Sequence, residues 1–157
     1  RSLEDAFKFA KMGGTIDLTC GESESKFHSV ADAVKKAKKE GVPMEKVTMS
    51  SDGQGSWSNY DAEGKLVEIG VSDVDTIYRQ IVYMVKEENM DLEELLALGT
   101  KNPAMALELY PKKGAVKEES DADILIMNED LSLDTVIAMG VPMMRDGKIL
   151  KKGTYEK

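Results

Sequence analysis

An aspartate followed by two glycines and a serine is the part of this sequence best suited to chemistry. Residues 47–51 form a short apolar run typical of a β-strand, and Asp52, Gly53, Gln54, Gly55 and Ser56 follow it directly. In α/β proteins, ligands bind at the carboxyl ends of strands, where side chains and backbone N–H groups converge. Glycines let the backbone approach a ligand at dihedral angles that other residues avoid. Asp52 is therefore our first candidate for a working residue; the alternative is a polar turn with a solvated carboxylate.

The elements around this turn predict a strand–helix–strand unit. Residues 15–20 alternate apolar and polar side chains, as a strand does. Ser29 is a plausible N-cap for a helix that runs to about Glu40, and residues 47–51 form the next strand. A helical crossover between strands of one sheet makes those strands parallel. The first residues, with a stripe from Leu3 to Ala10, predict a preceding helix.

Helices dominate the middle of the chain. Residues 59–65 are rich in turn formers, and residues 66–71 read as a short extended segment. Ser72 then carries a capping-box pattern, Asp91 starts a second helix in the same way, and Asn102 with Pro103 opens a third.

Short strands follow after residue 111. The pattern predicts strands at residues 114–116, 123–127 and 135–139, and then a hairpin whose tight turn is Asp146-Gly147. A β segment this small does not bury its own face, so it needs partner strands. The residue pattern thus predicts the closing part of a parallel α/β domain followed by part of a small β domain.

Composition excludes several classes of protein. The 157 residues carry a net charge of −8, which argues against a nucleic-acid surface, and no apolar run approaches the roughly 20 residues of a membrane span. The single cysteine, Cys20, forms no internal disulfide and fits a reducing cytosol. With His28 as the only histidine, the chain cannot build a typical zinc site alone. We therefore expect a fragment of a longer protein.

Several motifs together resemble the isoaspartyl dipeptidase (β-aspartyl peptidase) family of the metal-dependent amidohydrolase superfamily. The most specific of them runs from Ser50 to Ser56, and the resemblance covers essentially the whole chain. The others are Gly64-Lys65-Leu66, Ile69-Gly70-Val71, Thr100-Lys101-Asn102-Pro103-Ala104, Lys113-Gly114, Asp121-Ala122-Asp123, Arg145-Asp146-Gly147-Lys148 and Lys152-Gly153-Thr154-Tyr155-Glu156. The sequence departs from the superfamily at Glu118-Glu119-Ser120, where a glycine is usual before Asp-Ala-Asp.

The resemblance implies a (β/α)8 TIM-type barrel followed by a small β-sandwich domain. Residues 1–110 would form the last two barrel strands with their helices, and residues 111–157 the C-terminal strands of the β domain. It also implies two zinc ions, with Asp52 as a metal ligand and general base at the end of the eighth strand. Ser56 would hold the α-carboxylate of a small β-aspartyl dipeptide substrate, assisted by exposed N–H groups of the turn that Gly53 and Gly55 flank. The remaining metal ligands would lie outside this chain.

The resemblance leaves alternatives and predicts further properties. Another amidohydrolase, dihydroorotase-like or acting on N-acyl amino acids, would keep the barrel and change the substrate. The third hypothesis is a non-catalytic fragment that assembles with its own N-terminal half or with copies of itself. His28 is expected to be a surface or capping residue, and Cys20 a small semi-buried one. The isolated fragment is expected to be inactive, and the full-length protein to be a cytoplasmic homo-oligomer.

Overall fold

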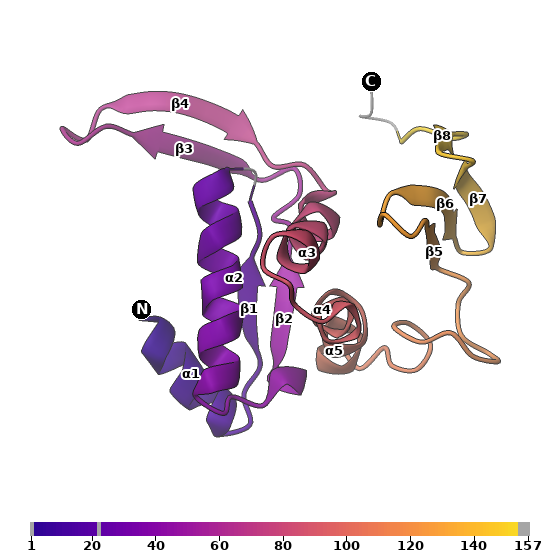
Figure 1. Cartoon of the computed structure of the whole chain (residues 1–157), viewed down its shortest axis with the longest axis horizontal. Coiled ribbons are helices and arrows are strands. Elements are labelled where there is room, and N and C mark those ends of the chain that lie inside the picture. Colours follow the sequence, from indigo (N-terminus) through magenta and orange to yellow (C-terminus); the bar gives the residue numbers. More distant parts are fainter. Residues whose placement is uncertain (1, 22, 154–157) are drawn as a thin grey trace.

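The computed structural model describes residues 2–21 and 23–153 (Figure 1). The elements are α1 (Leu3–Lys11), β1 (Ile16–Thr19), α2 (Glu24–Lys39), a 3-10 turn (Met44–Lys46), β2 (Val47–Ser50), β3 (Ser56–Tyr60), β4 (Leu66–Val71), α3 (Thr76–Lys86), α4 (Leu92–Gly99), α5 (Lys101–Ala106), β5 (Ile124–Met127), β6 (Leu133–Ala138), β7 (Val141–Arg145) and β8 (Lys148–Ile149). Within the described residues, no helix has the length and apolar character needed to cross a membrane.

β1 and β2 form a parallel pair, which confirms the predicted crossover through α2. Ile16 is opposite Val47 and Thr19 is opposite Ser50. Because side chains alternate between the two faces of a strand, the apolar residues of both strands enter one core with the helices. The other face of β1 is polar and exposed.

A carboxylate joins the two strands on this polar face. Asp17 accepts hydrogen bonds from the hydroxyl of Thr48 at 2.7 Å and from the hydroxyl of Ser50 at 2.6 Å. Both carboxylate oxygens are therefore used to tie β1 to β2, in addition to the backbone ladder. The end of β2, from which Asp52 projects, is held by side chains as well as by the main chain.

Two predicted helix starts are wrong. α2 begins at Glu24, before Ser29, because the hydroxyl of Ser23 accepts the backbone N–H of Lys26 at 3.2 Å and Glu24 places an acid in the first turn. α3 begins at Thr76, and its N-cap residue, Asp75, makes no capping hydrogen bond with its side chain. Ser72 is buried and belongs to the end of the preceding hairpin instead of capping α3. The predicted cap of α4 is confirmed, since Asp91 accepts the backbone N–H of Glu94 at 2.9 Å.

Asn102 in α5 fastens this helix beneath β2. Its side chain is 4% exposed, and its amide group donates to the carbonyl oxygens of Met44 and Val47, both at 2.8 Å. These two carbonyls lie at the entry to β2, so the amide fixes the start of the strand that ends at Asp52. The sequence pattern placed Asn102 at a helix start and gave no indication of this contact.

Replacing Asn102 with alanine should lower the free energy of unfolding by about 2 kcal/mol, because two carbonyl groups lose their donor. Urea denaturation measures this change. Met105→Ala is the matched control, since Met105 lies on the same helix with its side chain 46% exposed. Equal losses in the two variants would contradict the buried-amide explanation.

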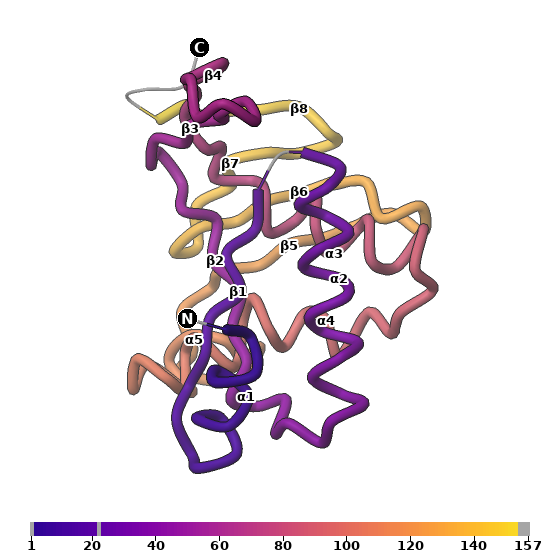
Figure 2. The backbone as a smooth tube through the Cα atoms, turned by 90° about the vertical axis from the view of Figure 1, so that its left-hand side faces the viewer, coloured from indigo at the N-terminus to yellow at the C-terminus, as the bar shows by residue number. Residues whose placement is uncertain are grey.

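β3 and β4 form an antiparallel hairpin in which Trp57 is opposite Gly70. β3 was missed, because residues 59–65 were predicted to be a turn-rich segment, whereas the strand continues to Tyr60. The hairpin lies across the end of the sheet toward which β1 and β2 point (Figure 1), and the side view in Figure 2 shows the same placement. It therefore covers the region where Asp52 leaves β2.

The last four strands form an antiparallel sheet in the order β5-β6-β7-β8. The predicted hairpin is confirmed, with φ values of 50° at Asp146 and 68° at Gly147, as tight two-residue hairpin turns require. The strand predicted at residues 114–116 is wrong, since this segment has no strand structure. The hydroxyl of Tyr78 in α3 donates to the carbonyl of Leu131 at 2.9 Å and joins this sheet to the helices.

An ion cluster orders the connection before β5. The ammonium of Lys113 pairs with Asp121 at 3.0 Å and also with Asp123. The carboxylate of Asp123 accepts the backbone N–H of Met139 at 2.7 Å. The Lys113 ammonium and this N–H lower the pKa of Asp123 from its usual value. Lys113 and the Asp-Ala-Asp segment therefore stabilise the connection before β5.

Candidate active site

The turn after β2 has an unusual backbone at Asp52. Asp52 has φ of 48° and Gln54 has φ of 65°, both in the left-handed region. The glycines were expected to supply this conformation, and that prediction is wrong, because neither Gly53 nor Gly55 has a positive φ. Asparagine and aspartate tolerate the left-handed region better than most residues, which suits Asp52 to its place.

The glycines are required for close contacts within the turn. A β-carbon on Gly55 would lie 2.8 Å from both the carbonyl oxygen and Oδ1 of Asp52. A β-carbon on Gly53 would lie 2.8 Å from Cγ1 of Val74. Gly55 therefore leaves the space in which the Asp52 carboxylate sits, and Gly53 lets the turn pack on the segment before α3.

The backbone N–H groups of the turn are occupied. Gly53 donates to the hydroxyl of Ser51 at 3.0 Å, Gln54 to the carbonyl of Ser72 at 2.8 Å, and Gly55 to the carbonyl of Asp52 at 2.8 Å. In this chain these three N–H groups already have acceptors, and the expected part of Gly53 and Gly55 in holding a substrate carboxylate stays a prediction. These bonds instead dock the turn on the end of the hairpin.

Asp52 lines a cleft of about 450 Å³ at the carboxyl ends of β1 and β2. Its carboxylate makes no hydrogen bond or ion pair with any residue that the structure describes. Every other lining residue comes from one of three places: the end of β1 with the first turn of α2, the hairpin, or the segment just after it. They are Thr19, Cys20, Gly21, Ser23, Lys26, Trp57, Asn59, Glu68 and Ser72.

Ser56 is not among the residues that line this cleft. It is the first residue of β3, its side chain is exposed, and its strand partner is Val71. Because successive residues of a strand face opposite sides, Ser56 and Trp57 point to different faces of the hairpin. The structure therefore brings Asp52 into the cleft and leaves Ser56 outside it.

Cys20 lies in the cleft wall but is not suited to nucleophilic chemistry. Its side chain is buried, and its backbone N–H donates to the carbonyl of Ser50 at 2.8 Å. Burial, together with the nearby charge of Asp17, raises the pKa of the thiol to about 12. A thiol that stays protonated at neutral pH is a poor nucleophile and metal ligand.

His28 is an exposed residue of α2, as expected. Its Nδ1 lies 2.6 Å from the hydroxyl of Tyr83, and the same nitrogen lies 3.6 Å from the carboxylate of Glu88. These contacts join α2 to α3, and the histidine is absent from the lining of the cleft. In the described part of the chain, no three His, Cys, Asp or Glu residues gather as a metal site would require.

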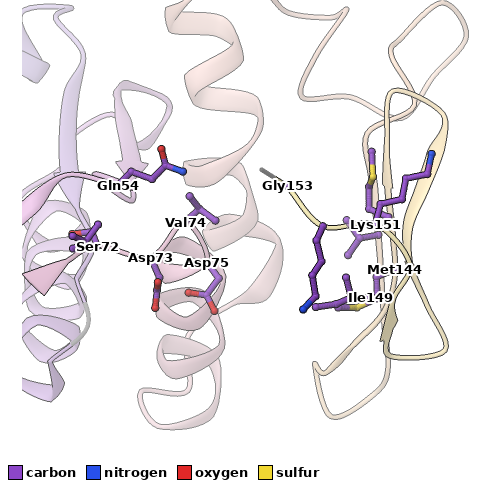
Figure 3. A pocket seen from close by; sticks show the side chains of 13 residues that line it. Gln54, Ser72, Asp73, Val74, Asp75, Met144, Ile149, Lys151 and Gly153 are labelled. Carbon is purple, nitrogen blue, oxygen red and sulfur yellow. The ribbon is translucent and has the colours of Figure 1, made fainter. Parts of the chain in front are cut away.

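A larger cleft, of about 1020 Å³, lies on the other side of the turn (Figure 3). It separates the hairpin and α3 from the tail sheet, with Gln54, Asp73 and Asp75 on one side and Met144 and Ile149 on the other. Asp52 does not line it. The smaller cleft is therefore the better candidate for an active site.

The sequence pattern missed most of the walls of the smaller cleft. Lys26 lies before the helix start predicted at Ser29, and the strand that carries Trp57 was not predicted. The alternation of polar and aromatic residues from Ser56 to Tyr60 was the available signal for that strand. No local pattern shows that Glu68 comes to lie near Asp52, because that proximity depends on how the hairpin folds back over the sheet.

Comparison with solved structures gives close matches. The β-aspartyl dipeptidase of the keratin-degrading thermophile Fervidobacterium islandicum AW-1, in complex with β-Asp-Leu dipeptide, matches 98% of this chain at 35% identity and a TM-score of 0.81. A second structure of the β-aspartyl dipeptidase from that organism matches 98% of this chain at 32% identity and a TM-score of 0.75. This chain spans 39% and 37% of the length of those two proteins.

More distant matches show the fold alone. The N-acetylglucosamine-6-phosphate deacetylase from Pasteurella multocida matches 83% of this chain, which covers 37% of that protein, at 16% identity and a TM-score of 0.60.

The model of the amidohydrolase family matches residues 3–150, which is nearly the whole chain. The protein belongs to the amidohydrolase family.

Proposed function

We propose that this chain is the C-terminal portion of a zinc-dependent β-aspartyl (isoaspartyl) dipeptidase. The identity of 35% to a β-aspartyl dipeptidase over 98% of this chain supports this substrate class above other amidohydrolases. The observation that carries the proposal is the carboxylate of Asp52, which stands at the end of a parallel strand, lines a cleft and has no partner among the described residues.

The residues that the structure describes do not by themselves provide a complete metal site. Asp52 can supply one oxygen ligand, and the described residues contain no group of three ligating side chains. The other ligands of the two zinc ions would come from parts of the enzyme outside this chain, so the isolated chain is predicted to be inactive. The ions, when bound, would polarise the scissile carbonyl and lower the pKa of the attacking water.

Asp52 would move the proton during hydrolysis. As general base it accepts a proton from the attacking water, and it then passes that proton to the nitrogen of the leaving amino acid. Gly55 leaves room for the carboxylate, and the bonds from the turn to Ser72 hold the backbone in place. The hydrogen bonds that Asp17 accepts from Thr48 and Ser50 stabilise β2, the strand that precedes Asp52.

The architecture that fits this role is the end of a barrel. β1 and β2 would be its seventh and eighth strands, residues 1–110 would belong to the barrel, and residues 111–157 to a small β-sandwich domain. The parallel pairing of β1 with β2, with helices on one face and a polar, exposed face on β1, supports this placement. A cytoplasmic location and a homo-oligomeric full-length enzyme stay predictions from the sequence.

Hydrolysis of β-Asp-Leu by the full-length enzyme tests this function directly. We expect release of leucine that is lost on chelation of the metal and restored by added zinc. An α-linked Asp-Leu dipeptide is the matched control substrate and should be cleaved far more slowly. Cleavage of dihydroorotate or an N-acyl amino acid in place of β-Asp-Leu would contradict the substrate class.

Ser56 lies outside the cleft of Asp52 in this chain, so our proposal that it binds the α-carboxylate of the aspartyl residue rests on the sequence motif and on the parts of the barrel outside this chain. Replacing Ser56 with alanine should raise the KM for β-Asp-Leu about tenfold and leave kcat nearly unchanged, because one hydrogen bond to a charged group is lost. Steady-state kinetics measures both constants. Ser58→Ala on the same face of β3 is the control, and an unchanged KM in the Ser56 variant would remove Ser56 from the site.

A further inference from the structure

β4 has one edge that no strand covers. It pairs with β3 on one side, and within the described residues no strand pairs with its other side. Figures 1 and 2 show β4 on the side of β3 that faces away from α2. The strand contains no proline, and Glu68 is its one charged residue. Such an edge presents backbone N–H and C=O groups that can pair with another chain, and β4 has few of the features that prevent this pairing.

The side chains of β4 that face away from the cleft are apolar. Val67, Ile69 and Val71 are each 60% exposed or more. Val71 lies opposite Ser56, which points away from the face that carries Trp57. Exposed apolar side chains that lie together mark surfaces of association. The edge strand of the hairpin therefore combines free backbone groups with an apolar row.

The backbone groups of Ile69 face the free edge. At the end of the hairpin, Ser72 donates its N–H to the carbonyl of Gly55 at 2.9 Å and accepts the N–H of Gln54 at 2.8 Å. The backbone groups of Ser72 thus point toward β3. Along an antiparallel strand, residues that bond to one side alternate with residues that face the other side, and the register is regular from Ser72 back to Ile69. A strand pairing centred on Ile69 can therefore form both of its hydrogen bonds.

We propose that β4 pairs antiparallel with β4 of a second copy of the protein, about a two-fold axis at Ile69. Two hairpins then form one four-stranded sheet, in which Ile69 exchanges both backbone hydrogen bonds with Ile69 of the second copy. The same register places Val67 beside Val71 of the second copy. The pairing uses the edge of β4 and leaves Ser56 exposed on β3.

The charges at the two ends of β4 favour a second copy over an unrelated strand. Lys65 comes directly before β4, and Asp73 follows it, exposed and 3.6 Å from Arg79. The two-fold axis brings Lys65 of each copy beside Asp73 of the other, so opposite charges meet at both ends of the interface. The nearby carboxylate of Asp61 is used within its own turn, where it accepts the backbone N–H groups of Glu63 and Lys65.

The remaining strands of the same enzyme belong at another place, a step that rests on the barrel proposed above. They would join the sheet at the free edges of β1 and β2. β4 lies beyond the carboxyl ends of both strands, with its free edge turned away from them (Figure 1). A second copy therefore fits this edge better than the rest of the barrel.

Analytical ultracentrifugation of the full-length enzyme tests the interface, with the variants Ile69→Lys, Lys65→Glu and the double variant Lys65→Glu/Asp73→Lys. Ile69 is exposed, so a single chain accommodates lysine there, whereas the paired sheet sets two like charges against each other. Val116→Lys is the matched control, because Val116 is an exposed apolar residue outside the hairpin. Thermal unfolding of each variant verifies that the fold is retained.

We expect the unmodified enzyme to sediment as a dimer or an assembly of dimers, and Ile69→Lys to raise the dissociation constant of the dimer by about 10²-fold or more. Lys65→Glu should weaken association by a smaller factor, and the added Asp73→Lys should restore it. A monomeric unmodified enzyme, or an unchanged mass in Ile69→Lys, would overturn the interface. An unchanged mass with a lower temperature of unfolding would show that another part of the same enzyme covers β4. Sedimentation does not depend on hydrolysis, so failure of the interface and failure of the proposed function are distinguishable.

Discussion

Asp52→Asn is expected to lower kcat for β-Asp-Leu by about 10³-fold in the full-length enzyme, because general-base catalysis contributes about 10²–10⁴-fold. Asparagine has nearly the same shape as aspartate and cannot accept the proton at the pH of the assay. The side chain has no partner among the described residues, so its replacement removes no internal contact. The expected loss is therefore chemical, and the temperature of unfolding should hardly change.

Steady-state kinetics, metal analysis and thermal unfolding together separate the two roles proposed for Asp52. A fall in kcat with full metal content would indicate loss of the base, and a fall in zinc content would indicate loss of a ligand. Asp32→Asn is the matched control, because Asp32 is an exposed carboxylate on α2 outside the cleft. A variant of Asp52 with near-normal turnover would remove this residue from the mechanism.

The position of Asp52 was predictable because it depends on local signals. The apolar run of β2 and the turn residues after it are contiguous, and the helix before β2 requires the two strands to be parallel. The hairpin turn at Asp146 and Gly147 and the cap at Asp91 were predicted for the same reason. Each of these features is decided within a few residues.

The starts of α2 and α3 could not be predicted from local sequence, because more than one residue near each start has the features of a helix cap. Ser23 and Ser29 both precede helix-compatible residues, and the structure uses the earlier one, which adds more than one turn to α2. Ser72 has a suitable capping pattern, but its backbone bonds to Gln54 and Gly55 keep it in the hairpin. Tertiary bonds decided the position of Ser72, whereas the cap at Ser23 is a local bond that places Lys26 in the first turn of α2.

The site itself was predictable only in its central residue. Trp57 and Glu68 enter the cleft because β3 and β4 pair and fold back across the ends of β1 and β2. That arrangement depends on contacts between residues distant in the sequence. The same contacts leave Ser56 on the other face of β3, which the sequence motif alone could not indicate.

Gly55→Ala, a substitution in the turn after β2, is expected to lower kcat/KM for β-Asp-Leu by about 10²-fold. A β-carbon at this position would lie 2.8 Å from the carbonyl oxygen of Asp52, 2.8 Å from its Oδ1 and 2.9 Å from its Cγ. Contacts this short force the carboxylate, the carbonyl or both to move. A displacement of about 1 Å in a reacting group can cost about 10²-fold in rate.

Gly64→Ala separates this displacement from ordinary backbone strain. Gly64 has φ of 79° in the hairpin turn, and a β-carbon there would meet no atom within 4 Å. The substitution should therefore cost about 1–2 kcal/mol of stability, through the left-handed conformation alone, and leave turnover intact. Gly55→Ala should instead lower turnover by more than any loss of stability explains, because its clash is with the carbonyl and the carboxylate of Asp52, the base that we propose. Equal losses of activity in the two variants would mean that the turn acts through general stability, and that the close approach of Gly55 to Asp52 has no part in catalysis.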